Sequence, residues 1–198
     1  MIDRVLVAAY DAGIEPILCL TKADLASPEP ICTMFEPLGV PIVVTEPESL
    51  LDKVDDLLVG HMTVLVGHSG VGKSTLINRL VPGADRSTGA VNEVTGRGRH
   101  ISTSAIALRL PGGDGWVIDT PGVRSFGLSH VTLDSVLGAF ADLSRHTDDC
   151  PRGCRHITGE PECGLDEAVM RGELSPQRLD SLRRIIGPLV EQGVGENH

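Results

Sequence analysis

Short apolar runs alternate along the chain with segments whose apolar positions recur every three or four residues. The runs lie at residues 16–20, 40–44 and 63–66. Runs of this length are typical of strands that are buried on both faces of a parallel sheet. The segments with helical periodicity are residues 5–13, 49–58 and 73–81. The alternation predicts an α/β fold with a mainly parallel sheet and helices on both of its faces.

The second half of the chain has a different pattern. Residues 105–110 and 115–119 are apolar and flank the sequence PGGDG, which predicts a β-hairpin. Residues 82–103 contain Gly, Pro and small polar residues without any period, which predicts a long functional loop. Beyond residue 130 the pattern turns helical, with an interruption by a cysteine-rich segment.

Two serines mark expected helix starts. Ser49 is placed as the N-cap of the amphipathic segment that follows it. Ser175 precedes Pro176, and proline at the first helical position predicts a helix that runs to residue 192. The Pro-containing segment between residues 20 and 40 is predicted to be mainly a loop.

Composition and charge limit the classes of protein that this chain can represent. Its 198 residues are 41% hydrophobic, enough for one α/β core with a small appended module. The formal net charge of −10 argues against a general nucleic-acid binder, although the basic stretches GRGRH and CPRGCRH could still contact RNA or be ordinary surface. The chain has neither a membrane-spanning run nor a signal-peptide pattern. We therefore expect a cytoplasmic protein with no membrane partner, and a monomer.

A glycine-rich loop follows the third apolar run. The sequence GHSGVGKS at residues 67–74 matches G-x-x-x-x-G-K-[ST] in full, and a helical segment follows it. Glycines allow successive backbone N–H groups to converge on phosphate, and the helix directs the positive end of its dipole at the same anion. The candidate nucleotide-binding residues are Gly67, His68, Ser69, Gly70, Val71, Gly72, Lys73, Ser74 and Thr75. Lys73 is the candidate catalytic cation at the β- and γ-phosphates, and the Ser74 hydroxyl is a candidate Mg²⁺ ligand.

Two further motifs are of the kind that accompanies a phosphate loop in a nucleotide-binding site. DTPG at residues 119–122 ends an apolar segment, so Asp119 can hold Mg²⁺ through water and the Gly122 N–H can contact the γ-phosphate. TKAD comprises Thr21, Lys22, Ala23 and Asp24. The Asp24 carboxylate can accept both the N1–H and the N2–H₂ of guanine, a pattern that adenine lacks, while the Lys22 stem lies across the base. Alone, TKAD could be an exposed turn; together with the phosphate loop it favours GTP.

A cysteine-rich segment carries the other candidate chemistry. Five cysteines in a chain without an export signal argue against a disulfide framework. Cys150, Cys154, His156 and Cys163 supply four ligands of the zinc type within fourteen residues. Three thiolates and one imidazole fit one closed, structural Zn²⁺ site, and the alternative is a set of reduced cysteines without metal.

The order of these motifs resembles that of the circularly permuted GTPases, and more narrowly the ribosome small-subunit-dependent GTPase A (RsgA or YjeQ) family. The resemblance rests on TKADL, GHSGVGKSTLIN, GRGRH, DTPGVRSFGL and the Cys/His segment. It implies a P-loop GTPase that hydrolyses GTP to GDP and phosphate with Mg²⁺. It further implies stimulation by the small ribosomal subunit and its rRNA, and a role in the late maturation of that subunit.

The resemblance also implies roles for residues outside the three motifs. A second base-contacting loop is expected near Thr45, where Glu46 stands in place of a small residue. In the loop GRGRHIST, Thr103 is the expected Mg²⁺-sensing threonine, with Ser102 next. Val123 stands where Ras-like enzymes carry the glutamine that orients the attacking water, so we expect His100 to do this. The alternative is that His100 contacts RNA or solvent.

Members of this family begin with a small β-barrel of OB type, which this chain lacks. The strand expected before residue 5, central between the strands that lead to TKAD and to the phosphate loop, is lacking as well. We therefore expect an N-terminally truncated GTPase domain at residues 1–141, of reduced stability, followed by a zinc-binding helical module at residues 142–198. Arginines around the cysteines could form a surface that faces rRNA, or be ordinary helical surface: Arg152, Arg155, Arg183 and Arg184.

Three other functions stay open on the sequence. The chain could be an RNA-binding switch that binds GTP without useful turnover, or a truncated remnant, as the missing glutamine and front end favour. It could be a P-loop kinase or ATPase, which requires TKAD to be a coincidence. A zinc-nucleated scaffold without nucleotide agrees least with these motifs.

Overall fold

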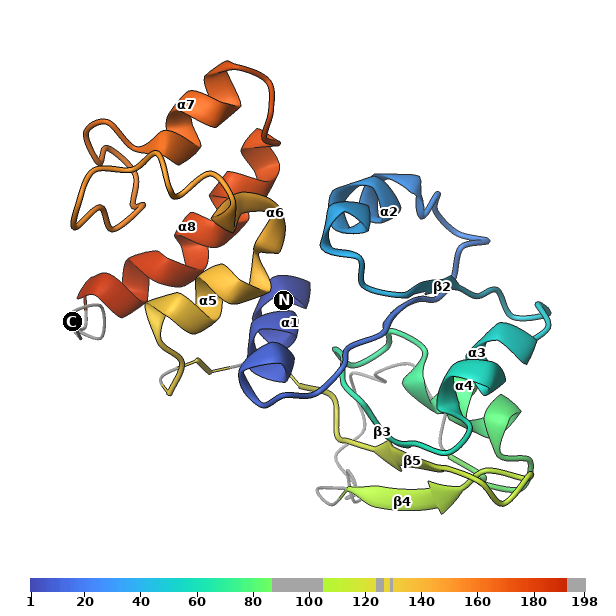
Figure 1. Ribbon diagram of the computed structural model, residues 1–198. Coiled ribbons are helices and arrows are strands. Elements are labelled where there is room, and N and C mark those ends of the chain that lie inside the picture. Colours follow the sequence, from blue (N-terminus) through green and yellow to red (C-terminus); the bar gives the residue numbers. More distant parts are fainter. Residues whose placement is uncertain (87–104, 124–126, 129, 192–198) are drawn as a thin grey trace, which may run out of the picture. The chain divides into compact units, whose positions relative to one another are not determined.

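A computed structural model describes residues 1–86, 105–123, 127–128 and 130–191 of the chain (Figure 1). The chain forms two compact units. The first, here called the helical unit, contains Met1–Leu18, Glu29–Ile42 and Phe126–His198, and the second, the sheet unit, contains Cys19–Pro28 and Val43–Ser125. The predicted domain boundary at residue 141 stays a prediction.

The sheet unit contains a three-stranded sheet in the order β3 (Met62–Leu65), β5 (Trp116–Asp119) and β4 (Ile106–Arg109). β3 pairs with β5 in parallel, and β4 pairs with β5 antiparallel as the predicted hairpin. The register places Leu65 opposite Asp119. Because the two strands run in parallel, the residues that follow each of them, the phosphate loop and DTPG, meet at the same edge of the sheet.

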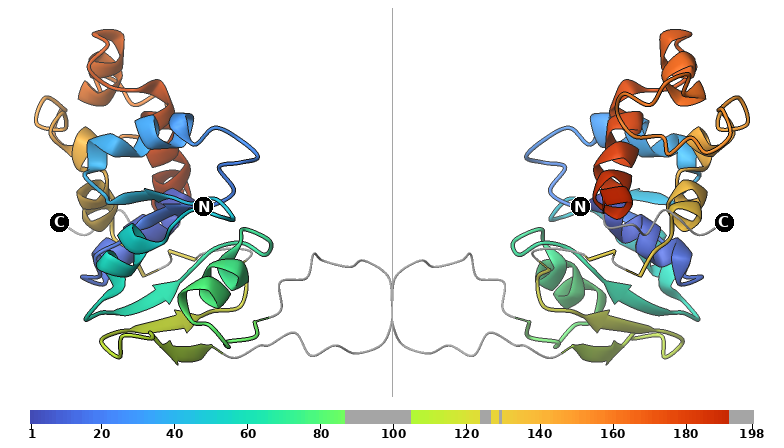
Figure 2. Two further views of the ribbon diagram at one scale, coloured as in Figure 1. Left: turned by 90° about the vertical axis from the view of Figure 1, so that its right-hand side faces the viewer. Right: turned by 90° about the vertical axis from the view of Figure 1, so that its left-hand side faces the viewer.

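Helix α4 (Lys73–Leu80) lies over this sheet, as Figure 2 shows from the side. Its Ile77 and the β5 residue Val117 are both fully buried. Alternate residues of β3 and β5 point to the other face and are exposed, with Met62 at 70% and Trp116 at 40%. The alternation follows from the two-residue period of a strand and places α4, with the loop before it, on one defined face.

A second, two-stranded sheet consists of β1 (Leu18–Leu20) and β2 (Ile42–Val44). The Leu18 N–H donates to the Pro41 carbonyl at 2.9 Å, and the Thr45 N–H donates to the Leu20 carbonyl at 2.8 Å. Among the described residues, β3 pairs with β5 alone. In the part of the chain that the structure describes, the strand that leads to TKAD and the strand that leads to the phosphate loop therefore belong to separate sheets.

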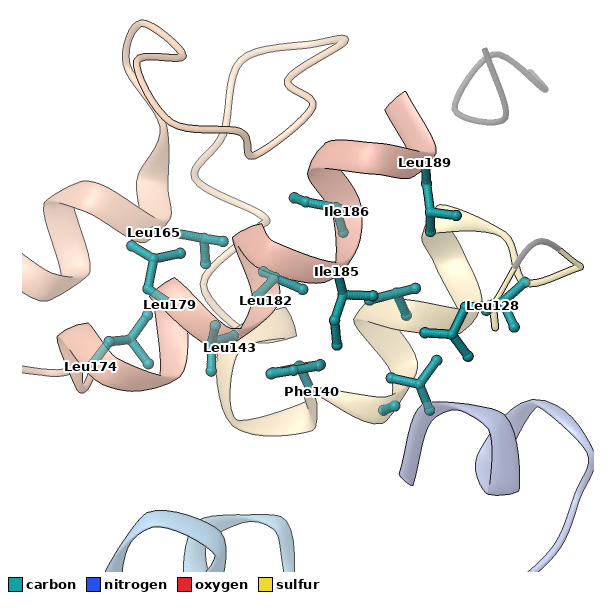
Figure 3. Packing of buried hydrophobic residues seen from close by; sticks show 14 of the residues in the cluster. Leu128, Phe140, Leu143, Leu165, Leu174, Leu179, Leu182, Ile185, Ile186 and Leu189 are labelled. Carbon is teal, nitrogen blue, oxygen red and sulfur yellow. The ribbon is translucent and has the colours of Figure 1, made fainter. Parts of the chain in front are cut away.

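The helical unit is built around its C-terminal helices. Its elements are α1 (Ile2–Asp11), α2 (Glu29–Phe35), η1 (Glu36–Leu38), α5 (Leu133–Ala139), α6 (Ala141–Ser144), α7 (Gly164–Met170) and α8 (Pro176–Glu191). Leu182 and Ile185 of α8 lie on the side of the helix that faces Phe140 and Leu143, in a core whose members are almost completely buried (Figure 3). None of the described helices is long and apolar enough to cross a membrane.

Two local expectations were wrong. Residues 29–38 form helix α2 and the 3₁₀ turn η1 rather than a loop, because Pro30 lies in the first turn of α2, where proline removes no helical hydrogen bond. Ser49 is not the N-cap of helix α3 (Asp52–Leu58), which begins after Leu51. The Ser49 hydroxyl instead closes a turn by bonding to the backbone of Glu46.

An arginine network joins three helices of the helical unit. Arg178 of α8 is only 2% exposed. Its guanidinium donates to both carboxylate oxygens of Asp142 at 2.9 and 3.2 Å, and to Asp3 of α1 at 2.9 Å. It also lies over the ring of Phe140, 4.4 Å from the ring centroid, and 5.4 Å from that of Phe35. This buried cation is therefore paired with two carboxylates and lies over aromatic rings.

Candidate functional site

The phosphate loop, residues 67–74, joins β3 to α4 in the sheet unit. Gly70 and Gly72 have φ angles of 81° and 100°, in the left-handed region that strains any residue with a side chain. Gly72 is also the residue before the first turn of α4. The glycines therefore let the chain turn sharply into the helix, as a loop that binds phosphate with its backbone requires.

Lys73 lies over the loop. Its Nζ donates to the carbonyl oxygens of Gly67 at 2.8 Å and His68 at 3.0 Å. Burial lowers the pKa of the Lys73 ammonium, and the Asp119 carboxylate acts in the opposite direction. Lys73 thus holds its charged Nζ against the backbone carbonyls at the start of the loop.

DTPG is fastened to the phosphate loop by several contacts. The Thr120 hydroxyl donates to the Leu65 carbonyl at 2.6 Å, and the Val123 N–H donates to the Gly67 carbonyl at 3.1 Å. A Cβ atom at Gly122 would lie 2.9 Å from the Ser69 backbone nitrogen. Only glycine fits at this approach, and the Gly122 N–H is held beside the loop.

Asp119 has a cationic partner that the sequence did not predict. The carboxylate is buried, and Arg86 donates to its Oδ2 from Nε at 2.8 Å and from a terminal nitrogen at 2.5 Å. Asn78 of α4 holds the Arg86 backbone by two hydrogen bonds of 2.8 Å, one to its carbonyl and one from its N–H. Arg86 therefore lies at the same carboxylate that is the predicted Mg²⁺ ligand.

The TKAD segment contacts the phosphate loop directly. The Thr21 hydroxyl donates to the Val71 carbonyl, and Lys22 Nζ donates to the Gly70 carbonyl at 2.7 Å. Lys22 itself has a positive φ of 60°, which sets the turn. The Ala23 N–H is directed at the Thr45 carbonyl at 3.4 Å, and Asp24 is exposed. The structure thus brings both predicted base-contacting segments together beside the loop, with the Asp24 carboxylate accessible.

The predicted metal ligands also lie together, in the helical unit. The ligand atoms of Cys150, Cys154, His156 and Cys163 are all within 4.8 Å of one another. The three sulfur atoms lie 3.5, 3.5 and 3.9 Å from His156 Nδ1. A tetrahedral zinc with Zn–S of about 2.3 Å and Zn–N of about 2.0 Å would place nitrogen and sulfur roughly 3.5 Å apart. The cluster therefore fits a Zn²⁺ ion coordinated through Nδ1.

Neighbouring groups hold these ligands in place. The Gly164 N–H donates to Cys150 Sγ at 3.2 Å, and a Cβ at Gly164 would lie 2.8 Å from the His146 carbonyl, so only glycine allows this approach. Arg183 donates to the His156 carbonyl at 3.1 Å and to both oxygens of Asp166 at 2.8 and 2.6 Å. Arg183, considered above for an RNA-facing surface, thus also holds the loop that carries His156, and its contact with RNA stays a prediction.

The protonation of the ligands is set by their burial. Burial raises the pKa of the Cys150 thiol and raises that of Cys154 to about 12. Burial also lowers the pKa of His156, which favours the neutral imidazole that a metal requires. A metal that binds here must therefore displace protons from the thiols.

Comparison with known proteins identifies the family of this arrangement. A sequence model of the RsgA GTPase family matches residues 1–129, which contain TKAD, the phosphate loop and DTPG in this rotated order. The chain belongs to the RsgA GTPase family. Two relatives, each named small ribosomal subunit biogenesis GTPase RsgA, are 40% identical in Pseudomonas aeruginosa (strain LESB58) and 42% identical in Ectopseudomonas mendocina (strain ymp). Both matches cover 200 residues, 96% of this chain and 58% of the relative.

Two solved structures share the fold of this chain. The crystal structure of YjeQ from Thermotoga maritima has a TM-score of 0.71 at 27% identity, over 96% of this chain and 65% of that one. The structure of YloQ, a circularly permuted GTPase, has a TM-score of 0.68 at 27% identity, over 96% of this chain and 62% of that one. The predicted fold, a circularly permuted P-loop GTPase, is confirmed, and the chain spans 58% of the length of the curated relatives named above.

Several predicted RsgA-type site residues lie outside the described residues. His100 and Thr103 fall in the segment 87–104, as does the basic stretch GRGRH. Their roles stay predictions. No role was predicted from the sequence for Arg86, Asn78 or Gly164, because only the fold shows which residues they contact.

Proposed function

We propose that the chain binds GTP with Mg²⁺ and hydrolyses it to GDP and phosphate. We further propose that the small ribosomal subunit and its rRNA stimulate this reaction, and that the protein acts in the late maturation of that subunit in the cytoplasm. The observation that carries the proposal is the convergence of TKAD, the phosphate loop and DTPG through the Thr21–Val71 and Val123–Gly67 bonds. The names of the relatives support the ribosomal role.

We propose that Mg²⁺ binds through the oxygens of the Ser74 hydroxyl and the Asp119 carboxylate, with Thr103 as the predicted third ligand. In the structure Oδ2 of Asp119 accepts from Arg86, so the ion would share this carboxylate with Arg86 or displace it. When bound, the ion would neutralise charge on the β- and γ-phosphates. Lys73 would add its own charge to the same oxygens, and Gly122 would donate its N–H to the γ-phosphate.

The reaction is an in-line attack of water on the γ-phosphorus, in which the bond to the β-phosphate oxygen breaks and GDP leaves. Val123 follows DTPG and is apolar, so it cannot orient this water. We assign that task to His100 in the 82–103 loop. For the cluster in the helical unit, we propose one structural Zn²⁺ held by its three cysteines and by His156.

Asp24→Asn is expected to change base specificity from guanine to xanthine. The carboxylate accepts two hydrogen bonds from guanine, whereas the amide can donate to the carbonyl that xanthine carries at the same position. Affinity for GTP should fall, and affinity for XTP rise, each on the order of 10- to 100-fold. Competition of each nucleotide with fluorescent GDP measures this.

Asp56→Asn is the matched control, because it removes an exposed acidic charge from α3 of the same unit. An unchanged ratio of GTP to XTP affinity in Asp24→Asn would contradict guanine recognition by TKAD. Equal competition by ATP and GTP in the unsubstituted chain would instead support a P-loop ATPase or kinase.

A further inference from the structure

Arg79, in the last turn of α4, makes two hydrogen bonds outside its own helix. One terminal nitrogen donates to the Glu46 carbonyl at 2.8 Å, and the other donates to the Ser49 carbonyl. Both acceptors lie about thirty residues earlier in the chain, in the turn that follows β2. An arginine near a helix C-terminus ordinarily donates hydrogen bonds to the last carbonyls of its own helix. The bonds from Arg79 to a distant turn therefore require another explanation.

The turn that Arg79 holds is the predicted second base-contacting segment. It is closed from within by Ser49, whose hydroxyl accepts from the Glu46 N–H and donates to the Glu46 carbonyl, both at 3.0 Å. At the start of the turn, the Thr45 N–H donates to the Leu20 carbonyl, and the Thr45 carbonyl accepts from the N–H of Ala23 in TKAD. The turn is therefore tied to TKAD at one end and to α4 through Arg79 at the other.

We propose that Arg79 is a positioning residue for guanine recognition. It connects the helix that begins at the phosphate loop to the turn 45–49, and so fixes the distance between the groups that hold the phosphates and those that read the base. This inference rests on the proposed binding of GTP. The planar guanidinium presents a separate terminal nitrogen to each of the two carbonyls, whereas lysine would have to reach both carbonyls from one nitrogen.

The test separates base binding from phosphate binding. Affinities for GDP and for inorganic pyrophosphate are measured by calorimetry for the unsubstituted chain, Arg79→Ala, Arg79→Lys and Lys53→Ala. Lys53 is an exposed cation on α3, and its removal matches the change in charge. Arg79→Ala is expected to bind GDP about tenfold more weakly and pyrophosphate equally well, with Arg79→Lys between the two and Lys53→Ala unchanged.

Unchanged GDP affinity in Arg79→Ala would overturn the inference. A parallel loss of GDP and pyrophosphate affinity would overturn it too, because Arg79 would then only stabilise α4. If the unsubstituted chain bound pyrophosphate but not GDP, guanine recognition itself would be refuted, and the proposed function would fail together with this inference.

Discussion

Removing the proposed zinc from the cysteine cluster is expected to unfold the segment around residues 150–163 and to lower the stability of the helical unit by several kcal/mol. Structural zinc contributes about 10–16 kcal/mol of apparent binding free energy in small zinc-dependent peptides at neutral pH. In the structure the segment is also held by the Gly164–Cys150 and Arg183–His156 bonds and by the Arg155–Glu160 ion pair, and Ile157 packs against the core. Residues 150–163 form neither a helix nor a strand, so without metal few backbone hydrogen bonds would hold them in place.

Cys154→Ser tests this with Cys32→Ser as its control, because Cys32 lies on α2 and outside the cluster. We expect one bound zinc per chain in the unsubstituted protein and in Cys32→Ser, and at least a hundredfold weaker binding in Cys154→Ser. Zinc affinity should also fall as pH falls, because the thiols, whose pKa burial raises, must release protons to bind. A chain that keeps its melting temperature and circular dichroism after complete chelation would contradict a structural metal.

Arg178→Met is expected to destabilise the protein by about 3–5 kcal/mol, the typical cost of removing one partner of a buried ion pair. The loss would leave the Asp142 carboxylate buried without a counter-ion, and it would also leave Asp3 unpaired. Methionine nearly preserves the volume between the Phe140 and Phe35 rings, so the loss reports mainly on charge.

Denaturant unfolding measures the effect, with Arg184→Met as the control. Arg184 lies on the same helix but is exposed, and it should change stability by less than about 0.5 kcal/mol. The double variant Arg178→Met/Asp142→Leu is expected to recover much of the loss, since it removes the stranded charge. A loss below about 1 kcal/mol in Arg178→Met would show that the network contributes little.

The sequence predicted the elements whose signals are local. The apolar runs became β1, β2 and β3, and the segments around PGGDG paired as a hairpin. The phosphate loop and the cysteine cluster were recognisable because their chemistry needs fixed residue types within a short span. Helix α2 was missed because Pro30 and Pro37 obscure a short helix of only seven residues.

Contacts between distant residues could not be read from the sequence. Arg79, Arg86 and Arg178 all look like ordinary surface arginines in a helical or loop pattern, and their partners lie about thirty or more residues away. Arg183 was considered for RNA binding, and the structure adds bonds to Asp166 and to the His156 carbonyl that the sequence did not predict. Such roles depend on which segments the fold brings together, and a single sequence does not contain that information.

The most direct test of the account is GTP turnover by this 198-residue chain, with and without purified small ribosomal subunits. Lys73→Ala serves as the control, because it removes the cation at the phosphate loop while leaving TKAD intact. We predict slow release of phosphate by the chain alone, a rate that rises when subunits are added, and no release above background by Lys73→Ala. Tight GTP binding with a rate that stays near zero in the presence of subunits would contradict hydrolysis and support a nucleotide-dependent switch.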